Sequence, residues 1–408
     1  MDLLPLEIFP LGLSSSVITT VWIGVLVVAF FNLRLGWVLS GLVVPGYLVP
    51  LLLINPWSAA VITGEAVVTY LLVHAFSERW SRLGFWSGLF GRDRFFALVL
   101  VSVIVRLVFD GWLLPLVGAY WAEHFDSSFD YRNNLHSFGL VIIALMANQF
   151  WKPGLLRGLV PLVVTVGITY LIVRYGLLAF TNFNVGQLGF LYEDLAASIL
   201  ASPKAYIVLL TTAFIASRMN LLYGWDFNGI LIPSLLALQW YQPSKILTSF
   251  GEAFLILLLA RLLLATPVFS RITMEGARKL VFFFNIGFAY KLLLAYALSR
   301  LAPEIKVTDA FAFGYLLSTL IAMRMHDHHV VARLTRASLQ TSLVAVAVAS
   351  VVGFGLTLLP LSRALLPETA AVTRVEVVER PDLAPLELLQ RDQLALYQAQ
   401  TRGHIPQP

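Results

Sequence analysis

Four ionisable residues interrupt long apolar segments of the chain, and they are the first candidates for chemistry. Glu65 and Arg106 lie in the first half, and Glu252 and Lys291 lie in the second half. Asp110 follows Arg106 by one helical turn on the same predicted helix face. If those segments cross a membrane, such charges must pair with one another or line a polar pathway. They indicate either buried ion pairs that hold helices together, or a cationic lining for a carboxylate-rich chain or a proton relay.

Two groups of basic residues flank these segments, and we expect them on the inner side of the membrane. They are Arg92, Arg94, Arg278 and Lys279. Lipid headgroups explain such patches adequately, and a docking surface for a cytoplasmic protein is the sharper hypothesis. The nearby run 326–329, His-Asp-His-His, does not have the spacing of a standard zinc site, so we expect a solvated loop there.

Motifs for independent catalysis are missing from the sequence. It has no P-loop, no dinucleotide fingerprint, no HExxH and no Ser/His/Asp set in a motif context. The chain has no cysteine, which excludes disulfides and thiol catalysis. We therefore expect no independent enzyme, no cofactor, no metal and no nucleic-acid partner.

The composition requires lipid as the main solvent. Of 408 residues, 59% are hydrophobic and only 12% are charged, and the mean hydropathy is +0.81. A soluble domain carries about 25% charged residues. The apolar runs are continuous rather than alternating, which predicts an all-α polytopic membrane protein rather than a barrel. Eight long segments are predicted at 17–33, 58–76, 95–118, 158–181, 203–217, 246–268, 280–301 and 337–360, and four short ones at 42–54, 138–151, 227–240 and 310–323.

The distribution of Lys and Arg favours twelve crossings with the N-terminus outside. With all twelve segments crossing, fourteen basic residues fall in inner loops and five in short outer loops. The predicted location is a bacterial cytoplasmic (inner) membrane, with the Pro-rich tail 361–408 outside. On length alone, each short segment is also compatible with a broken helix, a half-span or a re-entrant loop.

The sequence repeats itself. GWVLSGLVVPG (36–46) aligns with GWDFNGILIPS (224–234), and GRDRFFALVLVSVIVRL (91–107) aligns with GARKLVFFFNIGFAYKL (276–292). The alignment places Glu65 on Glu252 and Arg106 on Lys291, whereas Asp110 falls on Ala295. An even number of crossings per half makes the halves parallel. We therefore predict two six-segment repeats, 1–181 and 203–360, joined by an outer connector, 182–202.

Each repeat has a weaker internal similarity, which would make it a 3+3 inverted repeat with a short middle segment. The four short segments begin at glycines, and two of them have a Pro near their centre: Gly41, Pro45 and Gly46, then Gly139, then Gly229 and Pro233, then Gly314. Paired Gly/Pro-interrupted segments point to a transport site whose helix N-termini face an anion. Close packing of helices through small residues explains the same pattern.

These motifs resemble the CapC/PgsC family. The resemblance is carried by GLVVPGYL (41–48), by GRDRFFALVLVSVIVRLVFD (91–110) and by a third block that ends near Asn148. Usual members have one such unit, and this chain has two and a tail. The resemblance implies the membrane subunit of poly-γ-glutamate synthase. Its partners would be an ATP-dependent amide ligase of the Mur-ligase type and a CapA-like extracytoplasmic subunit. It implies no catalytic residues.

Two other functions also fit the sequence. The repeat plan and the buried charges are compatible with a self-sufficient secondary transporter of a small organic anion. The lack of catalytic motifs is compatible with a structural membrane anchor for a ligase.

Overall fold

The computed structural model describes residues 5–10, 12–38, 41–82, 91–124, 140–185, 203–224, 229–301, 307–312, 314–328 and 331–358. Met1–Gly353 is one compact unit, and the second unit, Phe354–Pro408, is described only as far as the end of the last helix. Within these ranges the regular elements are helices, apart from one isolated bridge. The predicted fold class, an all-α polytopic membrane protein, is confirmed.

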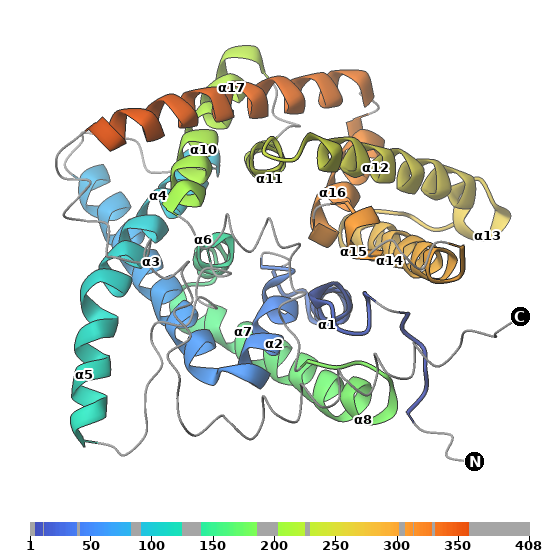
Figure 1. Ribbon diagram of the computed structural model, residues 1–408, viewed down its shortest axis with the longest axis horizontal. Helices are drawn as coiled ribbons and strands as arrows, with labels where there is room; N and C mark the ends of the chain where they lie inside the picture. The colour runs from blue at the N-terminus through green and yellow to red at the C-terminus, as the bar shows by residue number, and fades with distance from the viewer. Residues whose placement is uncertain are drawn as a thin grey trace, which may run out of the picture. The chain divides into compact units, whose positions relative to one another are not determined.

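The helices follow the order of the predicted segments (Figure 1). The first half contains α1 (Val17–Leu35), α2 (Val44–Ile54), α3 (Pro56–Arg82), α4 (Gly91–Val108), the π-helical η1 (Phe109–Leu113), α5 (Leu114–His124), α6 (Leu140–Phe150), α7 (Leu155–Leu171), the π-helical η3 (Ile172–Leu177) and α8 (Leu178–Phe180). The second half contains α10 (Pro203–Tyr223), α11 (Leu231–Gln239), α12 (Pro243–Leu264), α13 (Pro267–Ser270), α14 (Gly276–Leu301), α15 (Val307–Ala310), α16 (Gly314–His328) and α17 (Val331–Leu358).

Eight stretches of helix in the described residues are long and apolar enough to cross a membrane. The central helices α2, α6 and α11 have only 11, 11 and 9 residues, and α16 has 15. At 1.5 Å per residue, an 11-residue helix is about 16 Å long, roughly half of the hydrocarbon thickness. That all twelve segments cross the membrane therefore stays a prediction.

The two halves pack their helices in the same order. In the first half α1 packs on α2, and α3 and α4 both pack on α6. In the second half α10 packs on α11, and α12 and α14 both pack on α16. Matched glycines also share a left-handed backbone, with φ of 68° and 63° at Gly36 and Gly224, 77° and 64° at Gly41 and Gly229, and 54° at both Gly91 and Gly276. Residues with a side chain rarely adopt this backbone conformation, whereas glycine adopts it readily. The same turns therefore recur at the aligned glycines.

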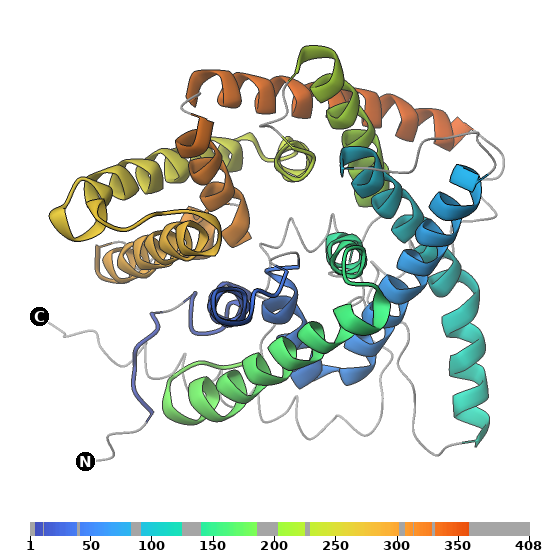
Figure 2. The same cartoon turned by 180° about the vertical axis from the view of Figure 1, so that it is seen from behind.

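The two largest contacts between the halves are reciprocal. Helix α1 of the first half packs on α14 of the second, and α10 of the second half packs on α4 of the first. Helices α1 and α10 are aligned counterparts, as are α4 and α14. Figure 2 shows α1 beside the second half and α10 beside α4. One hydrophobic cluster accordingly contains residues of both halves, such as Val21 and Phe288.

The two ends of the first half lie next to each other. Leu6, before α1, forms a parallel bridge with Thr181, after α8, and its amide donates to the Phe180 carbonyl at 2.9 Å. The Asn182 side chain also bonds the backbone of Phe9 in both directions. Ends on the same side of a membrane require an even number of crossings between them. This geometry agrees with parallel halves.

Several predictions fall outside the described residues. These are Gly139, most of the connector 182–202, residues 83–90 between α3 and α4, and the tail 361–408. The inverted relation inside each half also stays a prediction.

Candidate functional site

Glu65 and Arg106 form a buried ion pair between α3 and α4. Arg106 Nη1 donates to both carboxylate oxygens of Glu65, at 3.1 Å each. The exposed fractions are 0% for Glu65 and 3% for Arg106, so neither charge reaches lipid. Helices α3 and α4 pack on each other and share α6 as a neighbour. The structure thus brings together two of the residues that the sequence singled out.

Asp110 adds a second carboxylate to the same guanidinium. Its Oδ2 atom lies 2.9 Å from Arg106 Nε, and its side chain is 42% exposed. The apolar segment predicted at 95–118 is not a uniform α-helix, because η1 interrupts it at Asp110. π-helical turns of this kind occur frequently at functional sites. Tyr206 of α10 also interacts with Arg106, so the second half contributes to this charge cluster.

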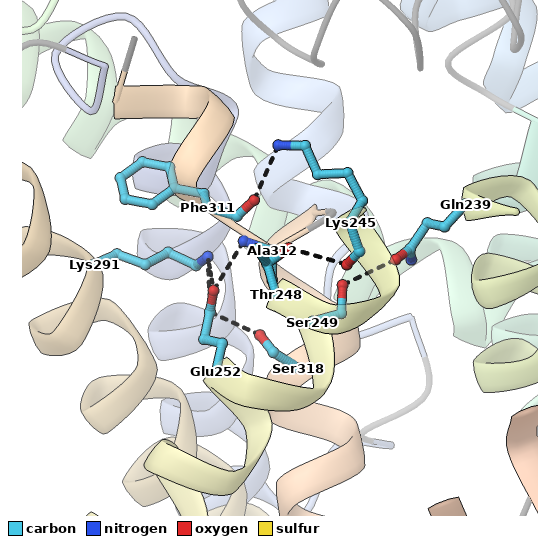
Figure 3. A network of polar contacts seen from close by, with 9 residues as sticks. All are labelled: Gln239, Lys245, Thr248, Ser249, Glu252, Lys291, Phe311, Ala312 and Ser318. Carbon is cyan, nitrogen blue, oxygen red and sulfur yellow. Dashed lines mark hydrogen bonds and ion pairs between the residues drawn. The ribbon is translucent and has the colours of Figure 1, made fainter. Parts of the chain in front are cut away.

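Glu252 and Lys291 form the matching pair between α12 and α14 (Figure 3). Lys291 Nζ lies 2.7 Å from Glu252 Oε1 and donates to Oε2 at 2.9 Å. The carboxylate also accepts the Ser318 hydroxyl at 2.8 Å and the Ala312 amide at 3.0 Å. Lys291 is 0% exposed and Glu252 is 4% exposed. Four hydrogen-bonding contacts thus satisfy this carboxylate completely.

Lys245 lies near the second pair, although the sequence placed it just outside the predicted segment 246–268. The structure corrects that expectation, because α12 begins at Pro243 and places Lys245 in its first turn, 4% exposed. Its Nζ atom donates to the Phe311 carbonyl at 3.2 Å. The Phe311 ring in turn lies 4.8 Å from Lys291 Nζ, in cation–π contact. Phe311, which lies before α16, therefore contacts both lysines (Figure 3).

The glycines of the short segments have different surroundings. A Cβ on Gly46 would lie 2.3 Å from Val21 Cα, and one on Gly24 would lie 2.5 Å from the Gly46 nitrogen. This is the close approach of α1 and α2 that packing through small residues predicts. Pro45 precedes Gly46 in the first turn of α2, and Pro233 precedes Ser234 near the start of α11.

Gly41 and Gly229 stand before α2 and α11, at the turns described above. Gly41 lies against the buried Gln149 side chain of α6, next to Asn148. The Gly229 carbonyl accepts the Asn220 amide at 3.0 Å. Gly314 begins α16, the helix that carries Ser318 to Glu252. Among these short segments, α16 is thus in direct hydrogen-bonding contact with an ion pair.

Some of the basic residues that were predicted on the inner side of the membrane contact other side chains of the protein. The Arg94 guanidinium lies 5.4 Å from the centre of the Trp151 ring, beyond the end of α6. Lys279 forms an ion pair with Asp327 of α16. In both halves the first turn of α4 or α14 is thus fastened to the end of the short helix. Arg278 is exposed, and the Arg92 side chain lies outside the described part.

The sequence alignment of the two halves missed part of the site around Glu252 and Lys291. Ser318 and Ala312 contribute a hydroxyl and a backbone amide, which carry no sequence signal as ligands. Lys245 aligns with Ser58, so a search for ionisable residues shared by both halves passes over it. The signal that was available is its place directly before the apolar run 246–268, two residues after Pro243.

Comparison with known proteins gives two matches. The family model described as "Capsule biosynthesis CapC" matches residues 23–159 and again residues 211–334. The protein named "PGA biosynthesis protein CapC" of Bacillus subtilis (strain 168) is 29% identical over 133 residues, which are 33% of this chain and 76% of that protein. No solved structure matches the chain significantly. The chain therefore belongs to the CapC family of capsule biosynthesis, and it carries the family's unit twice.

Proposed function

We propose that this protein is the integral membrane subunit of a complex that makes and exports poly-γ-glutamate or a similar capsule-type polyanion. The family match over two units carries the proposal, together with the similarity to a relative named for PGA biosynthesis. The multi-pass fold supports a role in the membrane step of this process. The proposed location is the bacterial cytoplasmic membrane, with the N-terminus and the tail outside.

The chemistry of polymerisation belongs to partners in this proposal. Joining glutamate through amide bonds consumes ATP, and the sequence has no phosphate-binding motif. A separate ATP-dependent ligase of the Mur-ligase type would supply the bonds, and a CapA-like subunit would act outside. The exposed Arg278 at the start of α14 is a candidate contact for a cytoplasmic partner or for lipid headgroups.

The buried charges offer a way to handle an anionic chain. Arg106 and Lys291 occupy matched positions in the membrane-spanning segments of both halves. Each cation is held by a carboxylate of this protein, so a carboxylate of the polymer is a chemically equivalent partner. Exchange of one carboxylate for another keeps the cation paired, which avoids the cost of a lone charge in lipid.

Deletion and complementation in the native bacterium test this function. The deletion strain is expected to lose surface polymer whose acid hydrolysate contains glutamate, and the wild-type gene is expected to restore it. Purification of the complex from native membranes should recover a ligase. Unchanged surface polymer in the deletion strain, together with uptake of a small organic anion by the purified protein in vesicles, would favour a secondary transporter instead. Co-purification of a ligase without any change in polymer export would indicate an anchor.

A further inference from the structure

The charge cluster of the first half contains one acid more than it contains bases. Glu65 of α3 and Asp110 of η1 both contact the single guanidinium of Arg106. From the neighbouring α10, Tyr206 also faces this group. Among the described residues, these four are the titratable groups that act on one another here. Since a phenol is ordinarily neutral near pH 7, the cluster has a net charge of −1 when both carboxyls are ionised.

A surplus negative charge is unfavourable at this place. Glu65 and Arg106 are buried, and the helix that carries Asp110 is a predicted membrane span. Two carboxylates near each other in a poorly solvated site favour protonation of one of them. The second half has no such surplus at the aligned position, because Ala295 stands where the first half has Asp110. The feature is therefore specific to one repeat rather than a general requirement of the fold.

Two buried hydroxyl groups lie on the face of α3 that carries Glu65. Ser58 and Thr69 lie seven residues before and four residues after Glu65, a spacing that places all three on one face of α3. Both side chains are 0% exposed, and neither hydroxyl has a hydrogen-bond partner in the described residues. Thr165 and Thr169 of α7, by contrast, donate to carbonyls one turn back. Buried hydroxyls without a protein partner are places where a water molecule binds.

We propose that Glu65, Arg106 and Asp110 form a proton-binding site within the membrane, which takes up one proton and thereby becomes neutral. A hydronium ion of the surrounding water gives up the proton: one of its O–H bonds breaks, an O–H bond to a carboxylate oxygen forms, and a neutral water molecule is left. We assign the exchange to Asp110, whose side chain is 42% exposed at the edge of the cluster, whereas Glu65 is fully buried. The π-helical turn of η1 holds Asp110 at this point, and Ser58 and Thr69 extend the polar face around Glu65. The proposal does not depend on the identity of the polymer.

Infrared difference spectroscopy on the purified full-length protein in lipid bilayers tests the site. Spectra recorded between neutral and acidic pH should contain the C=O stretch of a carboxyl group that becomes protonated, and this band should shift in D2O. Asp110→Asn should abolish the band, since the remaining Glu65–Arg106 pair is balanced and stays ionised. Glu65→Gln should abolish the same band, since Asp110 then balances Arg106. The matched change in the second half, Glu252→Gln, should leave the band in place.

Asp110→Asn and Glu65→Gln should each remove the same carboxyl band. A purely structural ion pair does not produce this result. Asp110→Asn keeps the shape of an exposed side chain, so it remains informative if Glu65→Gln fails to fold. A band that persists in Asp110→Asn, or its absence from the wild-type protein, overturns the proposal. Loss of the band on addition of sodium at constant pH also overturns it, since the site would then bind a metal cation.

Discussion

Trp22 of α1 stacks on Phe288 of α14, with ring centroids 4.2 Å apart and ring planes 3° from parallel. The Trp22 indole N–H also donates to the Asn285 side chain at 2.7 Å. These two contacts join the repeats at one of their two reciprocal interfaces. At the other, Tyr206 of α10 interacts with Arg106 of α4. The repeats are therefore interlocked, and neither holds a complete set of neighbours for its own helices.

Truncation of Trp22 tests this interface. Trp22→Ala removes the stacking and the hydrogen bond, and we expect it to lower the free energy of unfolding by about 1–2 kcal/mol. Trp22→Phe should recover most of the stability, because it keeps a ring on Phe288. Leu33→Ala, at an exposed position of the same helix, is the matched control and should have little effect. Thermal unfolding in detergent measures all three. Equal melting of Trp22→Ala and Leu33→Ala would show that the contact does not join the repeats.

The glycines at the crossing of α1 and α2 support a second prediction. Gly46→Ala would place a Cβ 2.3 Å from Val21 Cα, so α1 and α2 must move apart. We expect a loss of about 1–3 kcal/mol, the usual cost of overpacking. Gly64→Ala is the control, since no atom lies within 4 Å of the added Cβ and alanine favours helix. The prediction fails if both variants show the same thermal stability and the same yield from membranes.

The repeats could be predicted because similar sequence motifs recur in both halves. The buried pairs could be predicted because ionisable residues interrupt apolar segments. Glu65 and Glu252 interrupt apolar runs at aligned positions, and in lipid each must find a cation, which the same alignment supplies. The remaining ligands of Glu252 are a hydroxyl and a backbone amide, whose roles depend on how the residues before α16 fold back. Contacts between the repeats are tertiary, so helical periodicity reports that Trp22 is apolar but not which helix it meets.

The topology is open to a direct test because the chain has no cysteine of its own. Cysteines introduced at Ser87 and Ala399 can be labelled with a thiol reagent that does not cross the cytoplasmic membrane. We expect Ala399→Cys to react in cells with a permeabilised outer envelope, and Ser87→Cys to react only after the membrane is disrupted. The reason is the four arginines at the end of α3 and the start of α4, which favour the inner side. Labelling of Ser87→Cys alone in intact cells contradicts the predicted orientation.

The last prediction distinguishes a structural role of the Glu65–Arg106 pair from a role in polymer export. Single changes cannot do so, since each leaves a buried charge without its partner and is expected to cost ~3–5 kcal/mol of stability. Glu65→Leu, Arg106→Met and Asp110→Ala together remove the whole cluster, and the third change copies Ala295 of the second half. Apolar residues of similar volume replace a buried ion pair at little cost, so this variant should accumulate in the membrane near the wild-type level.

Surface polymer measured beside protein abundance then gives the answer. If Arg106 lines the path of an anionic chain, or if the cluster must take up a proton, the triple variant is folded but releases little polymer. The corresponding change in the second half, Glu252→Leu with Lys291→Met, is not an equivalent control, because it leaves the Ala312 amide without its acceptor. A better control is Leu107→Ala, next to Arg106 but exposed to lipid. Normal abundance with normal polymer in the triple variant would leave the pair with a structural role only, since it would show that no step of export needs a charge at this place.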